Sequence, residues 1–329
     1  MTTEKQLSQM QSKFEELFNE IQRVIVGNDD VIQDVLTGLL SEGHVLLEGV
    51  PGLGKTLLVR TLAQSLGLQF TRIQFTPDLM PADIVGTRVL NEDESGRRFF
   101  EFSKGPVFGN LVLADEINRA TPKTQSALLE AMQERSVTVG NKTHTLEEPF
   151  MVLATQNPIE MEGTYPLPEA QVDRFFFKIQ LRYPNVTELE GILARHAAGE
   201  EPVKIRQILS RQDILDAQKM VATIPVASPL RKYAARLVSA TQPQFEEATP
   251  LVKQYVEYGA SPRAALSLIR GAKAHAFLAG EVNVRVADIQ AVFYPSLRHR
   301  IIRNFKGEAE GITPEAILHQ VLSEIRESK

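Results

Sequence analysis

Four residues at the end of an apolar run have the types and spacing that bind a polyphosphate. Residues 44 to 56 read His-Val-Leu-Leu-Glu-Gly-Val-Pro-Gly-Leu-Gly-Lys-Thr, and Gly49, Gly54, Lys55 and Thr56 fit the pattern G-x-x-x-x-G-K-[ST]. In this pattern, backbone N–H groups close around phosphate, the lysine reaches the outer phosphates and the hydroxyl holds Mg²⁺. The start of the following helix adds unpaired N–H groups and a positive dipole end. The stretch predicts binding of a nucleoside triphosphate.

A second apolar run ends in two adjacent acids. Residues 111 to 116 read Leu-Val-Leu-Ala-Asp-Glu, which places Asp115 and Glu116 at the carboxyl end of a predicted buried strand. Ligands of open α/β sheets bind at that edge, and paired carboxylates there suit Mg²⁺-assisted hydrolysis. We expect Asp115 to hold the Mg²⁺ shell and Glu116 to orient and activate the attacking water.

Two further polar residues stay ambiguous on pattern alone. Asn157 ends the apolar run 150–157, where it could bond the γ-phosphate or the attacking water, or only form a turn. Arg263 follows Ser261-Pro262 at a predicted helix start, where the dipole disfavours a cation. Its partner is either an external anion or nothing more than solvent. The six histidines have no ligand spacing, so the only metal expected is nucleotide-borne Mg²⁺.

Five apolar or alternating runs supply the strands that position these groups. They cover residues 45–47, 70–75, 111–116, 150–157 and 175–181, with helical spacing between them, which predicts a doubly wound parallel sheet of the α/β class. Two alternating runs around residues 91–96, and two more around Gly140-Asn141, are typical of inserted hairpins. The predicted phosphate loop and acids fall at the carboxyl ends of strands.

Helical patterns occupy both ends of the chain. Apolar residues at helical spacing predict one helix over residues 4–23, and Asn28-Asp29-Asp30 would cap another through Leu40. After Tyr183-Pro184 we expect only helices, with cap and proline pairs at Ser228, Ser261 and Thr313 and a capping box from Ser210. This places a nucleotide-binding domain at 1–184, a helical domain at 185–329 and a linker near 199–202.

Composition bounds the class of protein. Hydrophobic residues at 43% and charged residues at 23% are ordinary for a globular protein, and no apolar run is long enough to span a membrane. There is no cysteine and no export-signal pattern at the N-terminus, which fits the cytoplasm. A net charge of −5 argues against a general nucleic-acid binder.

In one continuous order from about residue 24 to 181, these motifs resemble the AAA+ ATPases, and within them the MoxR family. The matching segments include 43–56, 73–79, 113–120, 125–134 and 154–175. The resemblance implies Walker A at the phosphate loop, Walker B at Asp115 and Glu116, and sensor 1 at Asn157. It also implies an arginine finger at Arg174, sensor 2 at Arg263 and a helical lid at the C-terminus. The implied nucleotide-binding residues are Val26, Gly27, Gly49, Pro51, Gly52, Leu53, Gly54, Lys55, Thr56 and Leu57, with Thr56 and Asp115 on Mg²⁺.

The resemblance further implies an ATP-hydrolysing ring, typically a hexamer, that remodels or matures a client protein with a von Willebrand factor A domain partner. A DNA-remodelling motor is the alternative, because related proteins use the same two hairpins on DNA. The absence of tryptophan and the acidic hairpin tip Glu92-Asp93-Glu94 oppose it, although Arg88, Arg97, Arg98 and Lys142 supply some positive charge. A non-catalytic scaffold would not need Glu116, and a small-molecule kinase would not explain Arg174 together with a lid.

Overall fold

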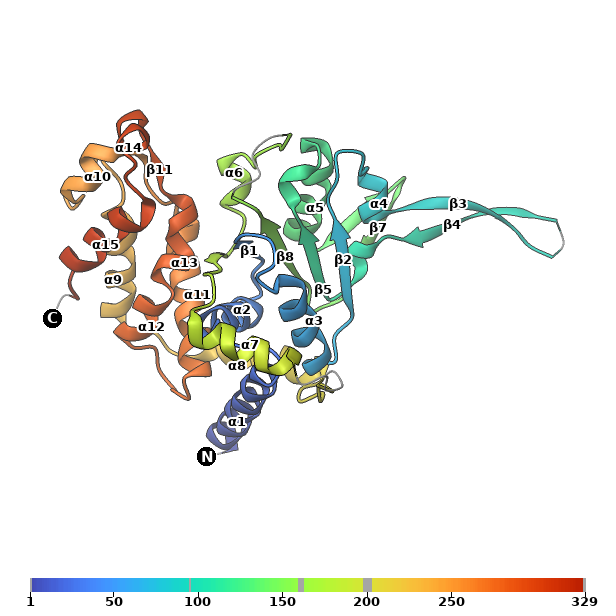
Figure 1. The fold of residues 1–329 in the computed structure, drawn as a ribbon, viewed down its shortest axis with the longest axis horizontal. Helices are drawn as coiled ribbons and strands as arrows, with labels where there is room; N and C mark the ends of the chain where they lie inside the picture. Colours follow the sequence, from blue (N-terminus) through green and yellow to red (C-terminus); the bar gives the residue numbers. More distant parts are fainter. Residues whose placement is uncertain (1, 95, 159–162, 198–202, 328–329) are drawn as a thin grey trace.

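A five-stranded parallel sheet forms the centre of the computed structural model, which describes residues 2–94, 96–158, 163–197 and 203–327. The strand order is β2-β5-β8-β1-β9 (Figure 1). The strands are β1 (Val45–Glu48), β2 (Phe70–Gln74), β5 (Leu111–Asp115), β8 (Met151–Gln156) and β9 (Phe177–Gln180). All five predicted strands are present. Because every pair in the sheet is parallel, their carboxyl ends meet at one edge.

The central strands are buried on both faces, which explains their continuous apolar sequences. Successive side chains alternate between two separate apolar clusters. One cluster takes Leu46, Val112, Ala114, Val152 and Ala154, and the other takes Val45, Leu47, Leu111, Leu113 and Leu153.

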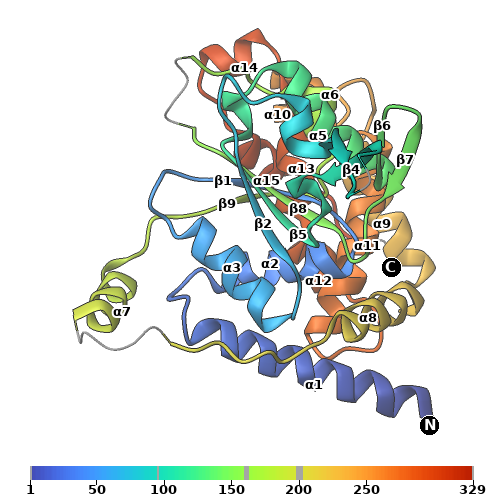
Figure 2. The same ribbon diagram turned by 90° about the vertical axis from the view of Figure 1, so that its right-hand side faces the viewer.

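Helices cover each face of the sheet. On one face lie α4 (Pro81–Val85) and α5 (Pro122–Glu134). The other carries α1 (Thr2–Gln22), α2 (Asp29–Leu40) and α3 (Lys55–Ser65). Helix α1 runs alongside α3 and α8 (Arg211–Thr223) (Figure 2). The helices predicted over residues 4–23 and through Leu40 are confirmed.

Both predicted hairpins are present. The first pairs β3 (Gly86–Glu92) with β4 (Arg98–Lys104), and it reaches away from the body of the molecule (Figure 1). The second pairs β6 (Ser136–Val139) with β7 (Lys142–Thr145). Its turn is at Gly140, where φ of +62° favours glycine.

The C-terminal part is helical except for one small sheet. The expectation of helices alone is wrong here, because β10 (Val256–Tyr258) and β11 (Ile302–Arg303) pair antiparallel. The helices after β9 are α7 (Val186–Ala197), α8 (Arg211–Thr223), α9 (Ser228–Ser239), α10 (Pro250–Tyr255), α11 (Pro262–Leu278), α12 (Val286–Ala291), α13 (Phe293–Leu297), α14 (Phe305–Ala309) and α15 (Pro314–Glu324). We call the part from α8 to α15 the lid. The predicted linker near 199–202 lies outside the described residues.

Predicted helix starts have mixed outcomes. Ser210 and Asp213 form the expected capping box, and Thr313 accepts from the N–H of Ala316. Ser228 was predicted to cap α9, but it is the first residue of that helix, and Ala227 occupies the N-cap position. The hydroxyl of Ser261 does not cap α11, because it donates to Asp173 in a distant segment.

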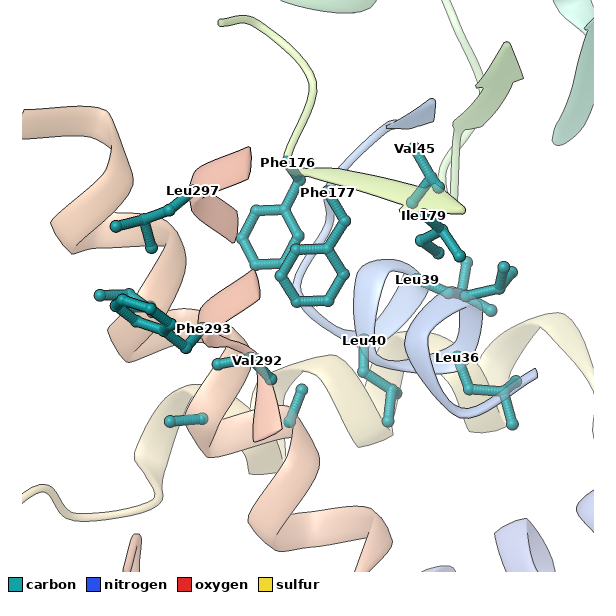
Figure 3. Close-up of a cluster of buried hydrophobic side chains, with 14 of the residues drawn as sticks. Leu36, Leu39, Leu40, Val45, Phe176, Phe177, Ile179, Val292, Phe293 and Leu297 are labelled. Carbon is teal, nitrogen blue, oxygen red and sulfur yellow. The ribbon is translucent and has the colours of Figure 1, made fainter. Parts of the chain in front are cut away.

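One apolar cluster joins the sheet to the lid. Figure 3 shows residues of α2 and β9 packed together, with Phe293 and Leu297 of α13 on the side of the lid. Its labelled members are Leu36, Leu39, Leu40, Val45, Phe176, Phe177, Ile179, Val292, Phe293 and Leu297. The chain between β9 and α7 contains neither helix nor strand, and a domain boundary at residue 184 stays a prediction. Within the described ranges, no helix combines the length and apolar character needed to cross a bilayer.

Candidate active site

The phosphate loop connects β1 to α3 at the carboxyl edge of the sheet. Gly54 immediately precedes α3 with φ of 77°, a left-handed conformation that glycine adopts without strain. No atom lies within 4 Å of a Cβ built there, so the backbone angle rather than space requires glycine. Lys55 is the first residue of α3, and its Nζ donates to the carbonyl of Gly49 at 2.6 Å. The lysine therefore folds back over the loop that the sequence predicts for phosphate.

Lys55 also faces the two acids that end β5. Burial lowers the pKa of Lys55, while the charges of Asp115 and Glu116 act in the opposite direction. The strand order explains this meeting, because β8 alone separates β1 from β5 in the sheet. The structure thus brings the predicted phosphate-binding lysine and both predicted acids to one place.

Asp115 is held by residues from both neighbouring strands. Arg72 on β2 forms an ion pair with its Oδ2 at 2.7 Å, and Thr155 on β8 donates to its Oδ1 at 2.7 Å. Arg72 and Thr155 were not identified as site residues from the sequence. Only the strand order could have indicated these two residues. Strands β2 and β8 flank β5, and their registers place Arg72 and Thr155 close to the end of β5.

Glu116 turns sharply at the end of β5. Its φ of 56° is left-handed, and its N–H donates to Thr155 Oγ1 at 2.8 Å. Its Oε2 accepts from Gln74 Nε2 at 3.0 Å and lies 3.3 Å from Nε of Arg119. The carboxylate is therefore oriented by one amide and one guanidinium. Gln74 is a third site residue, after Arg72 and Thr155, that was not identified from the sequence.

The oxygen ligands expected for Mg²⁺ fit that ion in kind. Thr56 is the second residue of α3, and Asp115 ends β5 on the same edge. Mg²⁺ requires about six oxygen ligands in octahedral geometry. One hydroxyl and one carboxylate leave most positions to phosphate oxygens and water, which suits an ion that arrives with a nucleotide.

A cavity of about 450 Å³ beside the phosphate loop has an apolar lining suited to a flat base. Gly27, predicted to be near adenine, has φ of +70°, and a Cβ there would meet the side chain of Glu188 on α7 at 2.6 Å. Glycine at position 27 therefore lets α7 pack closely against the segment beside the cavity. The lining also includes Tyr183 and Ile192, which were not predicted from the sequence. The predicted residues that line the cavity are Val26, Pro51, Gly52, Leu53, Gly54 and Leu57.

Asn157 follows β8 directly and is buried. Since β8 lies between β1 and β5, Asn157 is at the same edge as the phosphate loop and Glu116. The role of Asn157 as sensor 1, which the resemblance implies, stays a prediction.

Arg174 and Arg263 lie together at the opposite edge of the sheet. Both line a cavity of about 290 Å³ with His44, which precedes β1, and Phe176, which precedes β9. Strand β1 has four residues and spans roughly 13 Å between this cavity and the phosphate loop. Neither arginine lines the cavity beside the phosphate loop of its own subunit.

Each of these two arginines has a contact within the chain. Arg263 forms an ion pair with Asp173 at 3.2 Å, so the anion at the start of α11 is a carboxylate 90 residues away. Arg174 is exposed, and its Nη1 lies 3.5 Å from the carbonyl of Leu129 on α5. An exposed guanidinium at the rim of a cavity remains accessible to an anion from outside.

Comparisons with known proteins agree with this geometry. Residues 44–177 match the family described as "ATPase family associated with various cellular activities (AAA)", and residues 248–321 match the AAA lid domain. The chain is 48% identical to Chaperone MoxR1 of Mycobacterium tuberculosis over 306 residues, 93% of this chain and 80% of the relative. It is 42% identical to YeaC of Bacillus subtilis over 93% of this chain and 92% of the relative. It is 31% identical to Protein MoxR of Methylorubrum extorquens over 86% of this chain and 85% of the relative. A solved structure of a putative ATPase from Cytophaga hutchinsonii has a TM-score of 0.92 and 44% identity, covering 99% of this chain and 98% of the other.

Proposed function

Because this chain belongs to the MoxR family of AAA ATPases, we propose that it uses the hydrolysis of ATP to remodel or mature other proteins. One observation carries the proposal. Lys55, Asp115 and Glu116 meet at one edge of the sheet, while Arg174 and Arg263 meet at the opposite edge. A second copy of the chain is needed to bring both sets of charges to one nucleotide.

The residues at the carboxyl edge of the sheet have separate roles in binding the nucleotide and in hydrolysing it. The ammonium of Lys55 neutralises the outer phosphates, and the apolar cavity beside the loop takes the base. Thr56 and Asp115 would hold Mg²⁺, which neutralises charge that develops on the phosphates. Glu116, oriented by Gln74 and Arg119, positions the attacking water and takes up its proton. Asn157 bonds the γ-phosphate or that water.

A neighbouring subunit supplies the remaining positive charge. Arg174 acts as the arginine finger on the nucleotide of the neighbour, and Arg263 shares its cavity, so it acts on the same neighbour. Head-to-tail contacts of this kind close into rings, and we propose a hexamer working in the cytoplasm. One relative is named as a chaperone, Chaperone MoxR1. By extension of that role to this chain, we propose that it acts on a client protein together with a partner that carries a von Willebrand factor A domain.

We expect Lys55→Ala to abolish tight ATP binding. The substitution removes a charge-assisted contact to the phosphates, which costs about 2 to 5 kcal/mol, or roughly 30- to 4,000-fold in Kd. Isothermal calorimetry with ATP and Mg²⁺ measures the change. Lys219→Ala is the matched control, because Lys219 lies on α8, where it pairs with Asp216 at 3.6 Å. An unchanged ATP affinity for Lys55→Ala removes this lysine from the site.

We also expect no stable complex with random single- or double-stranded DNA at physiological salt. The relatives do not support the DNA-motor alternative, and Arg98 in the projecting hairpin is already paired with Glu92 at 3.2 Å. The measurement is fluorescence anisotropy of labelled DNA across a salt series. Submicromolar binding with a steep salt slope, together with stimulation of the ATPase by that DNA, would contradict the expectation.

A further inference from the structure

The segment that carries Arg174 is short, and it is bonded both by the residues just before it and by the lid. It lies between α6 (Glu169–Val172) and β9, and the sheet first bonds it at Phe176, whose N–H donates to His44 O. Arg174 itself is exposed, whereas Phe175 is fully buried. The position of the arginine therefore depends on what holds the residues on either side of it.

One lid arginine holds both of those neighbours. Arg300 ends the short 3₁₀ helix η3 (Arg298–Arg300). Its Nε donates to Asp173 Oδ1 at 2.8 Å, and its Nη2 donates to the carbonyl oxygens of Asp173 at 3.2 Å and Phe175 at 2.9 Å. The guanidinium thus bonds the residue before Arg174 and the residue after it.

The burial of Arg300 makes this contact specific. Its side chain is only 3% exposed, and burial lowers its pKa while Asp173 acts in the opposite direction. A buried guanidinium is costly unless its donors are satisfied, and its planar fork fixes the directions of those donors. A lysine at this position could keep the charge but could not reproduce the fork.

Other lid groups converge on the same segment. Ser261 donates to Asp173 Oδ1 at 3.1 Å, Arg263 pairs with Asp173 Oδ2 at 3.2 Å, and His299 Nε2 lies 3.0 Å from the carbonyl oxygen of Phe175. The pKa of His299 is lowered well below its usual value, mainly by burial and then by the charge of Arg300. Its ring is therefore neutral, and its Nε2–H donates to the carbonyl oxygen of Phe175. Every one of these contacts comes from the lid.

We propose that Arg300, through Asp173 and Phe175, is the positioning residue for Arg174, so that the lid sets where the arginine finger meets the neighbouring nucleotide. This rests on the proposed role of Arg174 in the adjacent subunit. A lid that shifts when its own subunit binds nucleotide or a partner then moves the finger that serves the next subunit. Arg300 touches no substrate itself.

The test is Arg300→Lys, measured as steady-state hydrolysis by the assembled protein. We expect kcat to fall roughly 10- to 100-fold, because a misplacement of about 1 Å can cost 100-fold, while KM for ATP stays unchanged. Arg303→Lys is the matched control, since Arg303 also bonds a backbone carbonyl but within the lid, at Ile312 O. Asp173→Asn is the second variant if Arg300→Lys does not fold, and the same fall in kcat is expected.

Mixed assemblies separate positioning of the finger from a general structural effect. Arg300→Lys subunits should regain activity when mixed with Lys55→Ala subunits, which have intact fingers, but not with Arg174→Ala subunits. The reverse pattern, or wild-type kcat in both Arg300→Lys and Asp173→Asn, overturns the inference. If Arg174→Ala alone keeps wild-type turnover, Arg174 is not the finger, and both the proposed function of Arg174 and this inference are wrong. That outcome differs from wild-type kcat in Arg300→Lys and Asp173→Asn, which overturns the inference alone.

Discussion

Replacing Glu116 with glutamine is expected to leave ATP bound and to slow its hydrolysis roughly 100- to 10,000-fold, the range that a positioned general base contributes. The amide preserves the shape of the side chain and still offers an oxygen to Gln74, which donates to Glu116 Oε2 at 3.0 Å. It cannot take up a proton from water, and it loses the ion pair with Arg119. The defect should therefore appear in kcat and not in ATP affinity.

Single-turnover hydrolysis and calorimetry, run on the same preparation, separate these two quantities. Glu257→Gln is the matched control, because Glu257 is an exposed acid on β10 in the lid. Asp115→Asn serves as a contrast and should instead weaken the dependence on Mg²⁺, since Asp115 is the expected ion ligand. Near-normal turnover in Glu116→Gln would show that another group activates the water.

The sequence predicted those parts of the site that are contiguous in the chain. The phosphate loop depends on left-handed glycine at Gly54 and on the residues beside it, and the acids of β5 follow directly from their own strand. Local pattern also predicted both hairpins, because alternation and turn residues are properties of short segments. These features need no knowledge of which strand lies next to which.

Parts that depend on strand order could not be predicted. Arg72 and Thr155 reach Asp115 from β2 and β8, and each is about 40 positions away in the chain. Tyr183, at the predicted boundary, lines the cavity beside the phosphate loop. The β10–β11 pair was missed because two or three residues are too few for a period of two to be detected.

Arg263 illustrates a correct physical signal with an unexpected partner. A cation at the start of α11 opposes the helix dipole, which left two partners open from the sequence, an external anion or solvent. Its partner is instead Asp173, which also binds Arg300, so the charge at the helix start is balanced within the chain. Only the folded structure could reveal that this carboxylate neighbours Arg174.

Arg174→Ala is expected to bind ATP normally and to hydrolyse it about 1,000- to 100,000-fold more slowly. An arginine finger stabilises charge that develops during phosphoryl transfer, and this range corresponds to about 4 to 7 kcal/mol. Arg174 lines the cavity at the amino edge of the strands, away from Lys55 and Glu116 in the same subunit. Hydrolysis should therefore depend on assembly, and the specific activity should rise with protein concentration.

Mixing two inactive variants tests whether Arg174 acts between subunits. Lys55→Ala subunits have an intact finger and a dead site, whereas Arg174→Ala subunits have a competent site and no finger. Some interfaces in a mixed ring pair a good site with a good finger, so activity should return above that of either protein alone. The control is a mixture of Lys55→Ala with Glu116→Gln. Both variants keep the finger but neither has a competent site, so this mixture should stay inactive. If the first mixture also stays inactive although light scattering shows that the two proteins assemble together, Arg174 serves its own subunit or only the fold, and Arg119, 3.3 Å from Glu116, becomes the next candidate.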